Sequence, residues 1–185
     1  MSTVALTKDQ YITIIEGIYD GIGGKEKNPA IATALQIEAN TGLRIGDVLS
    51  LRRGDIVKDG DRYRYDIKEH KTHKPRRFTV PDAVYLMIEA FCKDNDIEYG
   101  EKIFKFGVRN VQKRLFAIAD FLDYRNIGTH SFRKYFATKA YKNSGNDIEL
   151  VSRLLQHSNS SITRRYIGIE DERTENVLKA SVDLI

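Results

Sequence analysis

Apolar side chains recur every three or four residues over most of this chain, which predicts a series of amphipathic helices. Thr7 and Gln10 have the spacing of a capping box that opens the first helix, with Leu6 placed to pack on Tyr11. Gly42 is suited to the left-handed cap that ends the second helix. The predicted helices are residues 7–19, with Ile12, Ile15, Ile18 and Tyr19 as the buried stripe, then 30–40, 43–51, 82–91, 108–122, 129–142, 147–157, 162–169 and 171–185.

Between residues 55 and 80 the pattern changes to the alternation of apolar and charged side chains that is typical of strands. Tyr63, Tyr65 and Ile67 alternate with charged residues, and residues 58–61, which include Asp59 and Gly60, predict a hairpin turn. The stretch therefore predicts three antiparallel strands joined by two turns, the second of them basic. The predicted fold class is α+β, a mostly α-helical single domain with a small three-stranded antiparallel sheet.

Positive charge is concentrated in this predicted sheet. The chain has 30 Lys and Arg against 26 Asp and Glu, so its formal charge of +4 is by itself a weak sign of an anionic partner. Between Arg62 and Arg77, however, seven Lys and Arg stand against two acidic residues. A ribbon that contacts phosphates and a solvated strand face both explain this clustering. The candidate DNA-contacting residues are Lys74, Arg76 and Arg77 in this stretch, with Arg109 and Lys113 on the outer face of the predicted helix 108–122, where solubility is the alternative explanation.

Composition excludes several classes of protein. The one cysteine, Cys92, cannot form an internal disulfide and fits a reducing compartment. No window approaches the roughly 18 apolar residues that a membrane span needs, and the N-terminal residues lack a basic segment followed by an apolar one. With 185 residues the chain has the length of one domain. We therefore expect one cytoplasmic domain without a membrane partner.

Candidate chemistry lies in short-spaced polar residues on the predicted helices. Arg44 and Asp47 are three residues apart and share one side of a helix, where a solvated ion pair is the ordinary explanation. Thr129 is a predicted helix cap, and His130 and Arg133 share the first turn after it, a pairing that is common on helix surfaces. The remaining candidates are the sequence LLQH ending at His157, the tyrosine nine residues later at Tyr166, and a lysine in the basic turn.

Taken together and in this order, these residues resemble the catalytic domain of the tyrosine recombinases, the phage integrase family, from about Leu6 to the end of the chain. Two positions depart from the pattern of that family. The basic turn reads KTHK, with His73 where glycine is common, and Gln156 precedes His157 where glycine is frequent.

The resemblance implies a mechanism of DNA cleavage. Arg44 and Arg133 would clamp one scissile phosphate with forked hydrogen bonds. Tyr166 would attack the phosphorus, form a 3′-phosphotyrosyl link and release a 5′-hydroxyl. The resemblance implies neither a metal ion nor any other cofactor in this reaction.

The remaining roles follow from the same resemblance. His130 would act as the base that accepts the tyrosine proton, and Lys71 would protonate the leaving 5′-oxygen. His157 would donate a hydrogen bond to a non-bridging phosphate oxygen, and Asp47 would orient the pocket from behind. Lys68 and Lys74 are alternatives to Lys71 as the acid.

Other interpretations of these residues remain open. Tyr166 shares helical spacing with Ile162 and Ile169, which by default indicates a buried tyrosine, and Tyr124, Tyr135 and Tyr141 are alternative nucleophiles. His70 and His73 have zinc-ligand spacing, but a zinc site needs three or four protein ligands, and the single cysteine is distant. We expect no metal site.

The function implied is site-specific DNA recombination for the integration, excision or inversion of a phage or mobile element. The alternatives are strand cleavage and religation of the type IB topoisomerase kind and a DNA-binding regulator that retains the fold. The expected partners are double-stranded DNA, with recombination sites in the nucleoid, and further copies of the chain forming a tetramer on DNA. No DNA-clamping domain precedes the catalytic resemblance, so residues 1–185 would be either the catalytic part of a longer integrase, which we favour, or a short recombinase.

Overall fold

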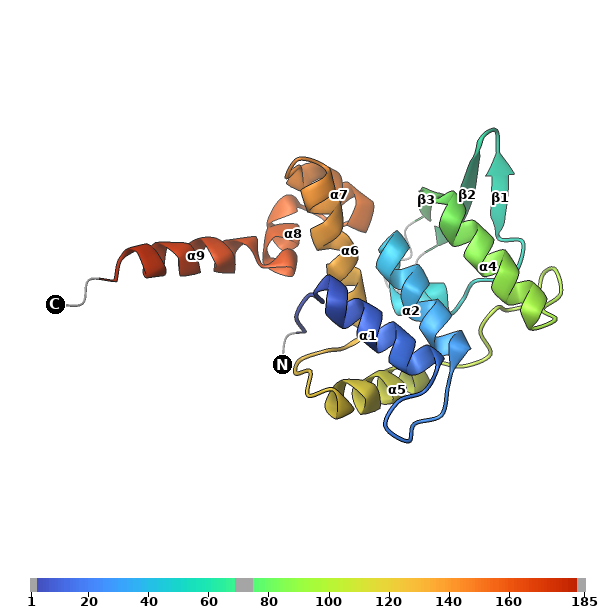
Figure 1. Ribbon diagram of the computed structural model, residues 1–185. Helices are drawn as coiled ribbons and strands as arrows, with labels where there is room; N and C mark the ends of the chain where they lie inside the picture. Colours follow the sequence, from blue (N-terminus) through green and yellow to red (C-terminus); the bar gives the residue numbers. More distant parts are fainter. Residues whose placement is uncertain (1–2, 69–74, 183–185) are drawn as a thin grey trace.

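The computed structural model of the protein describes residues 3–68 and 75–182, and its one small sheet lies at an edge of the helical part, beside α4 (Figure 1). The helices are α1 (Lys8–Tyr19), α2 (Pro29–Thr41), α3 (Ile45–Val48), α4 (Asp82–Asp94), α5 (Val108–Phe121), α6 (Thr129–Asn143), α7 (Ile148–Leu155), α8 (Ser160–Ile167) and α9 (Ile169–Ala180). The strands are β1 (Ile56–Asp59), β2 (Arg62–Lys68) and β3 (Pro75–Val80). The predicted fold class, mostly helical with a small three-stranded antiparallel sheet, is confirmed.

The sheet has the order β1-β2-β3, with both neighbouring pairs antiparallel. Asp59 pairs with Arg62, so the first turn consists of Gly60 and Asp61, one residue later than a turn centred on Asp59 and Gly60. Gly60 has a φ of +62°, and a glycine with positive φ at the first turn position matches the right-handed twist of a hairpin. α4 covers one face of the sheet (Figure 1).

The buried stripe of α1 differs in part from the prediction. Ile15 and Ile18 are buried as expected, together with Ile14. Ile12 and Tyr19 were wrongly assigned to the stripe, because their side chains are 38% and 50% exposed. The face of α1 that contains Ile14 and Ile18 packs on α2 and α5, and the two exposed residues lie at the margins of that face.

The predicted helix over residues 43–51 is only one turn long, α3. Leu43 and Leu51 are buried, as their spacing indicated, but neither lies in the helix. The turn begins at Ile45, whose N–H donates a hydrogen bond to the carboxylate of Glu38, and Arg44 keeps an extended backbone as its N-cap. A side chain on the preceding helix therefore sets this helix start, which local periodicity does not reveal.

The N-cap of α6 is Gly128 rather than the predicted Thr129. Thr129 is the first helical residue and is buried, and the Gly128 N–H donates to the hydroxyl of Ser131 at 3.1 Å. The cap predicted at Thr7 is confirmed, since its side chain accepts a hydrogen bond from the N–H of Gln10, and Asp147 at the start of the predicted helix 147–157 caps α7 in the same way. The sequence therefore predicted the cap at the start of α6 one residue too late.

α8 packs on α6 and α7, and α9 continues the chain away from them. Gly168, with a φ of +78°, separates α8 from α9, so the predicted segment through Ile169 is divided between two helices. Ile162, which shares its helical spacing with Tyr166, is 42% exposed. α9 projects from the rest of the structure (Figure 1), and its apolar residues Val177 and Leu178 are 60% and 63% exposed.

Candidate active site

The site is assembled around the end of α2, where Gly42 turns the chain toward Arg44. Gly42 has a φ of +66° and caps α2 in the left-handed conformation, as predicted. A Cβ at this position would lie 2.5 Å from the ring of Phe136 on α6, so only glycine permits the close packing of α2 against α6. This packing brings Arg44, at the start of α3, near the residues that α6 carries. Arg44 is partly exposed and Asp47 is buried.

Arg133 on α6 is almost completely buried, with 2% of its surface exposed. Its Nη2 donates a hydrogen bond of 2.8 Å to the backbone carbonyl of Leu155, which is the last residue of α7. The guanidinium thus connects α6 to the chain that leads directly into His157. A guanidinium has five N–H donors, so this bond leaves further donors for an anion.

His157 lies just beyond the end of α7. Gln156 before it has a φ of +54°, so the glycine frequent at this position is replaced by a residue that still adopts the left-handed conformation. The His157 Nδ1 lies 2.8 Å from the hydroxyl of Thr163, which is completely buried on α8. When that hydroxyl donates to Nδ1, the imidazole proton is on Nε2, which is then a donor for an anion.

Tyr166 lies on α8, three residues after Thr163. Its hydroxyl donates to the backbone carbonyl of His130 at 3.4 Å. Its ring makes an edge contact with the imidazole of His157 at a centroid distance of 5.3 Å, and the Nζ of Lys134 lies 5.3 Å from the tyrosine ring centroid. The tyrosine is therefore held between the first turns of α6 and the end of α7, while the His130 side chain remains exposed.

The electrostatics of Tyr166 connect it to both candidate arginines. Burial raises the pKa of its phenol to about 12, and the charge of Glu38 adds to that rise. Arg133, through its charge and a hydrogen bond, and Arg44, through its charge, act in the opposite direction. The phenol is thus neutral at physiological pH, in a site with two guanidiniums that favour its ionised form.

Sequence reasoning missed two residues of this cluster, Glu38 and Thr163. Glu38 follows Ile31 and Leu35 at helical spacing on the buried face of α2, and an acid on an apolar stripe is the signal that could have identified it. Thr163 lies among the polar residues between His157 and Tyr166, and no sequence pattern distinguished it from them. Both are completely buried.

The remaining predicted residues either lie outside the described part of the chain or are exposed elsewhere on it. Lys71 and Lys74 lie outside the described residues, as do His70 and His73. Arg77 is exposed on β3 and pairs with Asp66 at 3.1 Å. The remaining candidates for DNA contact are Arg76, whose backbone lies in β3, and Arg109 and Lys113, which are exposed on α5.

The described part of the chain contains no group of three or more His, Cys, Asp or Glu side chains placed to bind a metal ion. None of the helices within residues 3–68 and 75–182 is long and apolar enough to cross a membrane.

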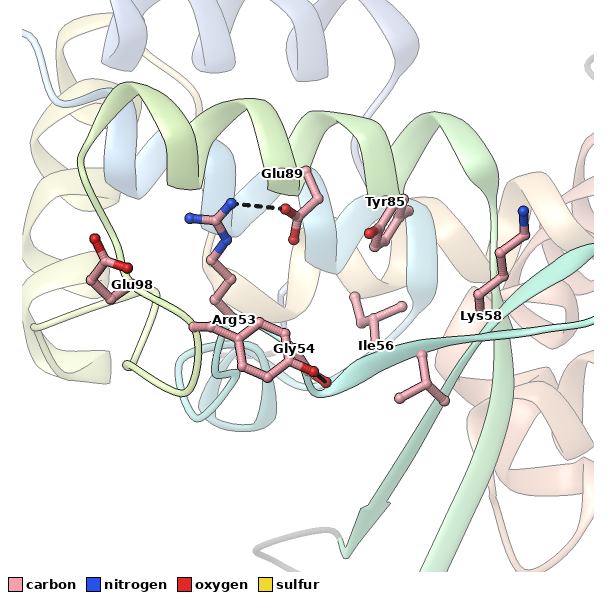
Figure 2. A pocket seen from close by; sticks show the side chains of 9 residues that line it. Arg53, Gly54, Ile56, Lys58, Tyr85, Glu89 and Glu98 are labelled. Atoms are coloured by element: carbon pink, nitrogen blue, oxygen red, sulfur yellow. Dashed lines mark hydrogen bonds and ion pairs between the residues drawn. The ribbon is translucent and has the colours of Figure 1, made fainter.

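A separate cavity of about 430 Å³ lies between α4, β1 and the loop that follows Leu51. Figure 2 shows Arg53 and Glu89 in this cavity, where the guanidinium and the carboxylate form an ion pair at 3.3 Å. Tyr85 and Lys58 also line it. This cavity shares no lining residue with the cluster around Arg133 and Tyr166.

The helices and small sheet described above form the catalytic-domain fold of the tyrosine recombinases. Among solved structures, the XerH site-specific recombinase bound to its difH substrate matches with a TM-score of 0.68 and 22% identity, over 89% of this chain and 50% of that one. The catalytic domain of bacteriophage HP1 integrase matches with a TM-score of 0.66 and 16% identity, over 97% of this chain and 96% of that one. These structural matches show the fold.

The sequence profile of the phage integrase family matches residues 5–173. The "Probable integrase/recombinase YoeC" of Bacillus subtilis (strain 168) is 32% identical over 147 residues, which cover 76% of this chain and 78% of YoeC. The chain belongs to the phage integrase family. Its match to XerH covers about half the length of that recombinase.

Proposed function

We propose that this protein is a site-specific DNA recombinase that cleaves and rejoins DNA through a 3′-phosphotyrosyl intermediate, in the integration, excision or inversion of a phage or mobile element. The observation that carries the proposal is the placement of the Tyr166 hydroxyl within the electrostatic reach of Arg44 and Arg133, with its ring against His157. Family membership and a fold shared with a recombinase bound to its DNA substrate support it.

Cleavage begins with binding of the scissile phosphate by the two guanidiniums. Arg133 is held by the Leu155 carbonyl, and Arg44 contributes from the start of α3. Forked hydrogen bonds to the non-bridging oxygens neutralise the charge that develops on the pentavalent phosphorus. Because both arginines are set by helix packing before DNA arrives, little reorganisation is needed in the reaction.

The tyrosine hydroxyl then attacks the phosphorus. A bond forms between the phenolic oxygen and phosphorus, the bond from phosphorus to the 5′-oxygen breaks, and the phenolic proton passes to the imidazole of His130. A proton acceptor is needed because the pKa of the phenol is about 12. Lys71, as the proposed acid, gives a proton to the departing 5′-oxygen. Religation reverses these steps with a new 5′-hydroxyl.

His157 donates from Nε2 to a non-bridging oxygen of the same phosphate. The Thr163 hydroxyl holds Nδ1 at 2.8 Å and so fixes both the ring orientation and the tautomer. Asp47, buried on α3, supports the arginines from the protein side. The protein side chains supply both the proton transfers and the charge neutralisation, so the proposed reaction needs no metal ion.

Double-stranded DNA would be bound by the basic surface around the site. The proposed contacts to its backbone are made by Lys74, Arg76 and Arg77 near the second turn of the sheet, and by Arg109 and Lys113 on α5. Such contacts would set affinity and orientation, whereas base contacts would select the recombination site.

Assembly on DNA would use the exposed apolar residues of α9. Val177 and Leu178 are at least 60% exposed on this helix, which projects from the rest of the structure, and Val182 just beyond its end is 64% exposed. We propose that α9 packs on a neighbouring copy and that strand exchange takes place in a tetramer. Replacing Val177 and Leu178 by Asp should lower the mass of the protein–DNA assembly measured by light scattering, and an unchanged mass would contradict this role.

The cleavage step can be tested with a half-site that carries a nick next to the scissile phosphate, so that the cleaved end diffuses away and the covalent protein–DNA adduct accumulates. The wild-type protein should form an adduct that survives a denaturing gel, and Tyr166→Phe should not. An excess of chelator should leave the yield unchanged, and loss of the adduct in chelator would contradict the metal-free mechanism.

The acid can be assigned with the same half-site. Lys71→Ala should cleave slowly when the leaving atom is oxygen and recover when that atom is sulfur, because a thiolate needs no proton to depart. Lys74→Ala is the matched variant. Recovery by sulfur in Lys74→Ala alone would identify Lys74 as the acid.

A further inference from the structure

Lys134 on α6 is a half-buried lysine to which the proposed mechanism assigns no role. Its ammonium donates a hydrogen bond of 2.5 Å to the backbone carbonyl of Thr3. The same Nζ lies over the ring of Tyr166, 5.3 Å from the ring centroid, which is within the range of a cation–π contact. Because an ammonium has three N–H donors, both contacts can be made together. The side chain therefore joins the N-terminal segment to the ring of the proposed nucleophile.

The N-terminal segment that holds this ammonium is itself fixed to the rest of the protein. The N–H of Val4 donates a hydrogen bond of 3.1 Å to the carbonyl of Asn126, in the loop between α5 and α6. Leu6 is 6% exposed and packs in the main hydrophobic core. The ammonium of Lys134 is thus held by a carbonyl whose own position is set by a backbone hydrogen bond and a buried side chain.

Two successive turns of α6 contact Tyr166 at different points. The tyrosine hydroxyl donates to the carbonyl of His130 at 3.4 Å, and Lys134, one turn later on the same side of the helix, lies over the ring. The imidazole of His157 makes an edge contact with the same ring. Contacts at the hydroxyl and on the ring together restrict the orientation of the phenol.

We propose that Lys134 is a positioning residue for DNA cleavage, whose ammonium, held by the Thr3 carbonyl, keeps the Tyr166 ring in the orientation from which its hydroxyl attacks. The inference rests on the proposed function. It adds a residue that acts through the nucleophile, and it makes the N-terminal segment part of the support of the site.

A purely structural link between the N-terminal segment and α6 is the competing explanation for Lys134. Such a link needs only a donor for the Thr3 carbonyl, which a neutral side chain also supplies. A carbonyl oxygen and the face of an aromatic ring are both negative, and here they converge on the same side-chain atom. A positive charge satisfies both, so the charge of Lys134 is explained by its contact with the ring.

The test uses Lys134→Met, which keeps an unbranched apolar stem and removes the ammonium. With saturating nicked half-site DNA, the single-turnover rate of adduct formation should fall about tenfold, the size expected for the loss of a partly buried cation–π contact. The dissociation constant for DNA should stay unchanged. Lys139→Met is the matched control and should cleave at the wild-type rate, because Lys139 is exposed on the same helix.

A change in the ring itself separates the cation–π contact from a general defect. Fluorine atoms on the ring of residue 166 withdraw electrons from the face on which the cation acts and so weaken the contact. They also alter the nucleophile, but they do so in both proteins. The ratio of the wild-type rate to the Lys134→Met rate should therefore be smaller with a difluorinated tyrosine at this position than with tyrosine. An equal ratio would overturn the positioning role, and so would a Lys134→Met variant that cleaves at the wild-type rate.

Lys134→Gln provides a second variant if Lys134→Met does not fold, because its amide keeps a polar end without the charge. It should show a similar rate loss with the same dependence on ring fluorination, and a wild-type rate would contradict the proposal. A wild-type protein that forms no adduct at all would refute the proposed function and this inference with it, whereas adduct formation unaffected by Lys134 variants refutes only this inference.

Discussion

Two arrangements of arginine and glutamate in this molecule differ in their surroundings. Arg53 and Glu89 form a direct ion pair at 3.3 Å, with side chains that are 27% and 31% exposed. Arg133 and Glu38 are almost wholly buried, and Arg133 also bonds to the end of α7. Partly solvated pairs such as the first contribute about 0–1 kcal/mol to stability.

Burying Arg133 and Glu38 costs more free energy than leaving an ion pair partly exposed, and these two residues lie at the candidate site. Removing two charges from water costs several kcal/mol per ion even after the protein relaxes, and their attraction must offset that cost. The cluster of Glu38 and Arg133 sits beside Tyr166 and the start of α3, whereas the Arg53 pair lines a cavity apart from it. The difference teaches that burial, rather than a direct ion pair, distinguishes the arginine and the glutamate that lie at the candidate site.

The largest effect should come from conservative replacement of Arg133, the buried arginine of the two. Arg133→Lys keeps the charge near Glu38 but loses the fork that can bind both the Leu155 carbonyl and a phosphate. Its rate of adduct formation should fall at least about 100-fold, or roughly 2.7 kcal/mol, as for the loss of a donor that stabilises transition-state charge. Arg53→Lys should cleave at the wild-type rate. Similar losses in both variants, measured under single-turnover conditions, would remove the distinction between the two regions.

A smaller effect is expected from the buried hydroxyl that orients His157. Thr163→Val removes the partner of Nδ1 while keeping the side-chain shape, so the imidazole loses its fixed tautomer. The rate of adduct formation should fall about tenfold. Thr13→Val on α1 is the matched control and should cleave normally. If the Thr163 variant cleaves at the wild-type rate at every pH tested, its hydroxyl does not orient His157.

The buried acid should also leave a signature in stability as a function of pH. The pKa of Glu38 is raised in the folded state, so its favourable contribution is complete below the unfolded value, near 4.5, and is lost as the pH rises through the folded-state pKa. As the pH rises through the folded-state pKa, the free energy of unfolding of the wild-type protein should therefore fall relative to that of Glu38→Gln. The fall should be about 1.4 kcal/mol for each unit by which the folded-state pKa exceeds the unfolded one. Chemical unfolding of both proteins between pH 4 and pH 9 measures this, and parallel curves would contradict a buried, ionisable Glu38.

The smallest effect belongs to the exposed pair. Glu89→Gln should change the free energy of unfolding by less than about 1 kcal/mol, because solvent screens an ion pair at this exposure. Urea unfolding at neutral pH measures the change. A loss of several kcal/mol would show that the pair in Figure 2 is as important to stability as a buried one.

Much of the fold could be predicted because its signals are local. The Thr7 capping box, the left-handed Gly42 and the alternation over Tyr63 and Tyr65 each act within a few residues, and each is confirmed. The errors occur where a residue on another helix or strand determines the local structure. The helix predicted from Leu43 is shortened to α3, whose start is fixed by Glu38 on another helix.

The candidate site was accessible from sequence only through spacing and resemblance. His157 and Tyr166 were identified because their separation along the chain matches a known pattern, and the structure places their rings in contact. Thr163 was missed because its burial depends on other elements and no spacing encodes it, whereas Glu38 could have been noticed as an acid on the apolar stripe of its helix. The catalytic roles of these residues remain predictions, and that of Lys71 concerns a residue outside the described ranges.

The central claim is that Tyr166 becomes covalently joined to DNA, and peptide mapping of the trapped adduct tests it most directly. Trypsin cuts after Arg165 and Arg173 and yields a peptide in which Tyr166 is the only tyrosine, distinct from the peptides that contain Tyr135 and Tyr141. After nuclease trimming of the DNA, mass spectrometry should find the remaining nucleotide, with a 3′-phosphate link, on the peptide of residues 166–173. A nucleotide on any other tyrosine peptide, or an adduct that persists in Tyr166→Phe, would contradict the account.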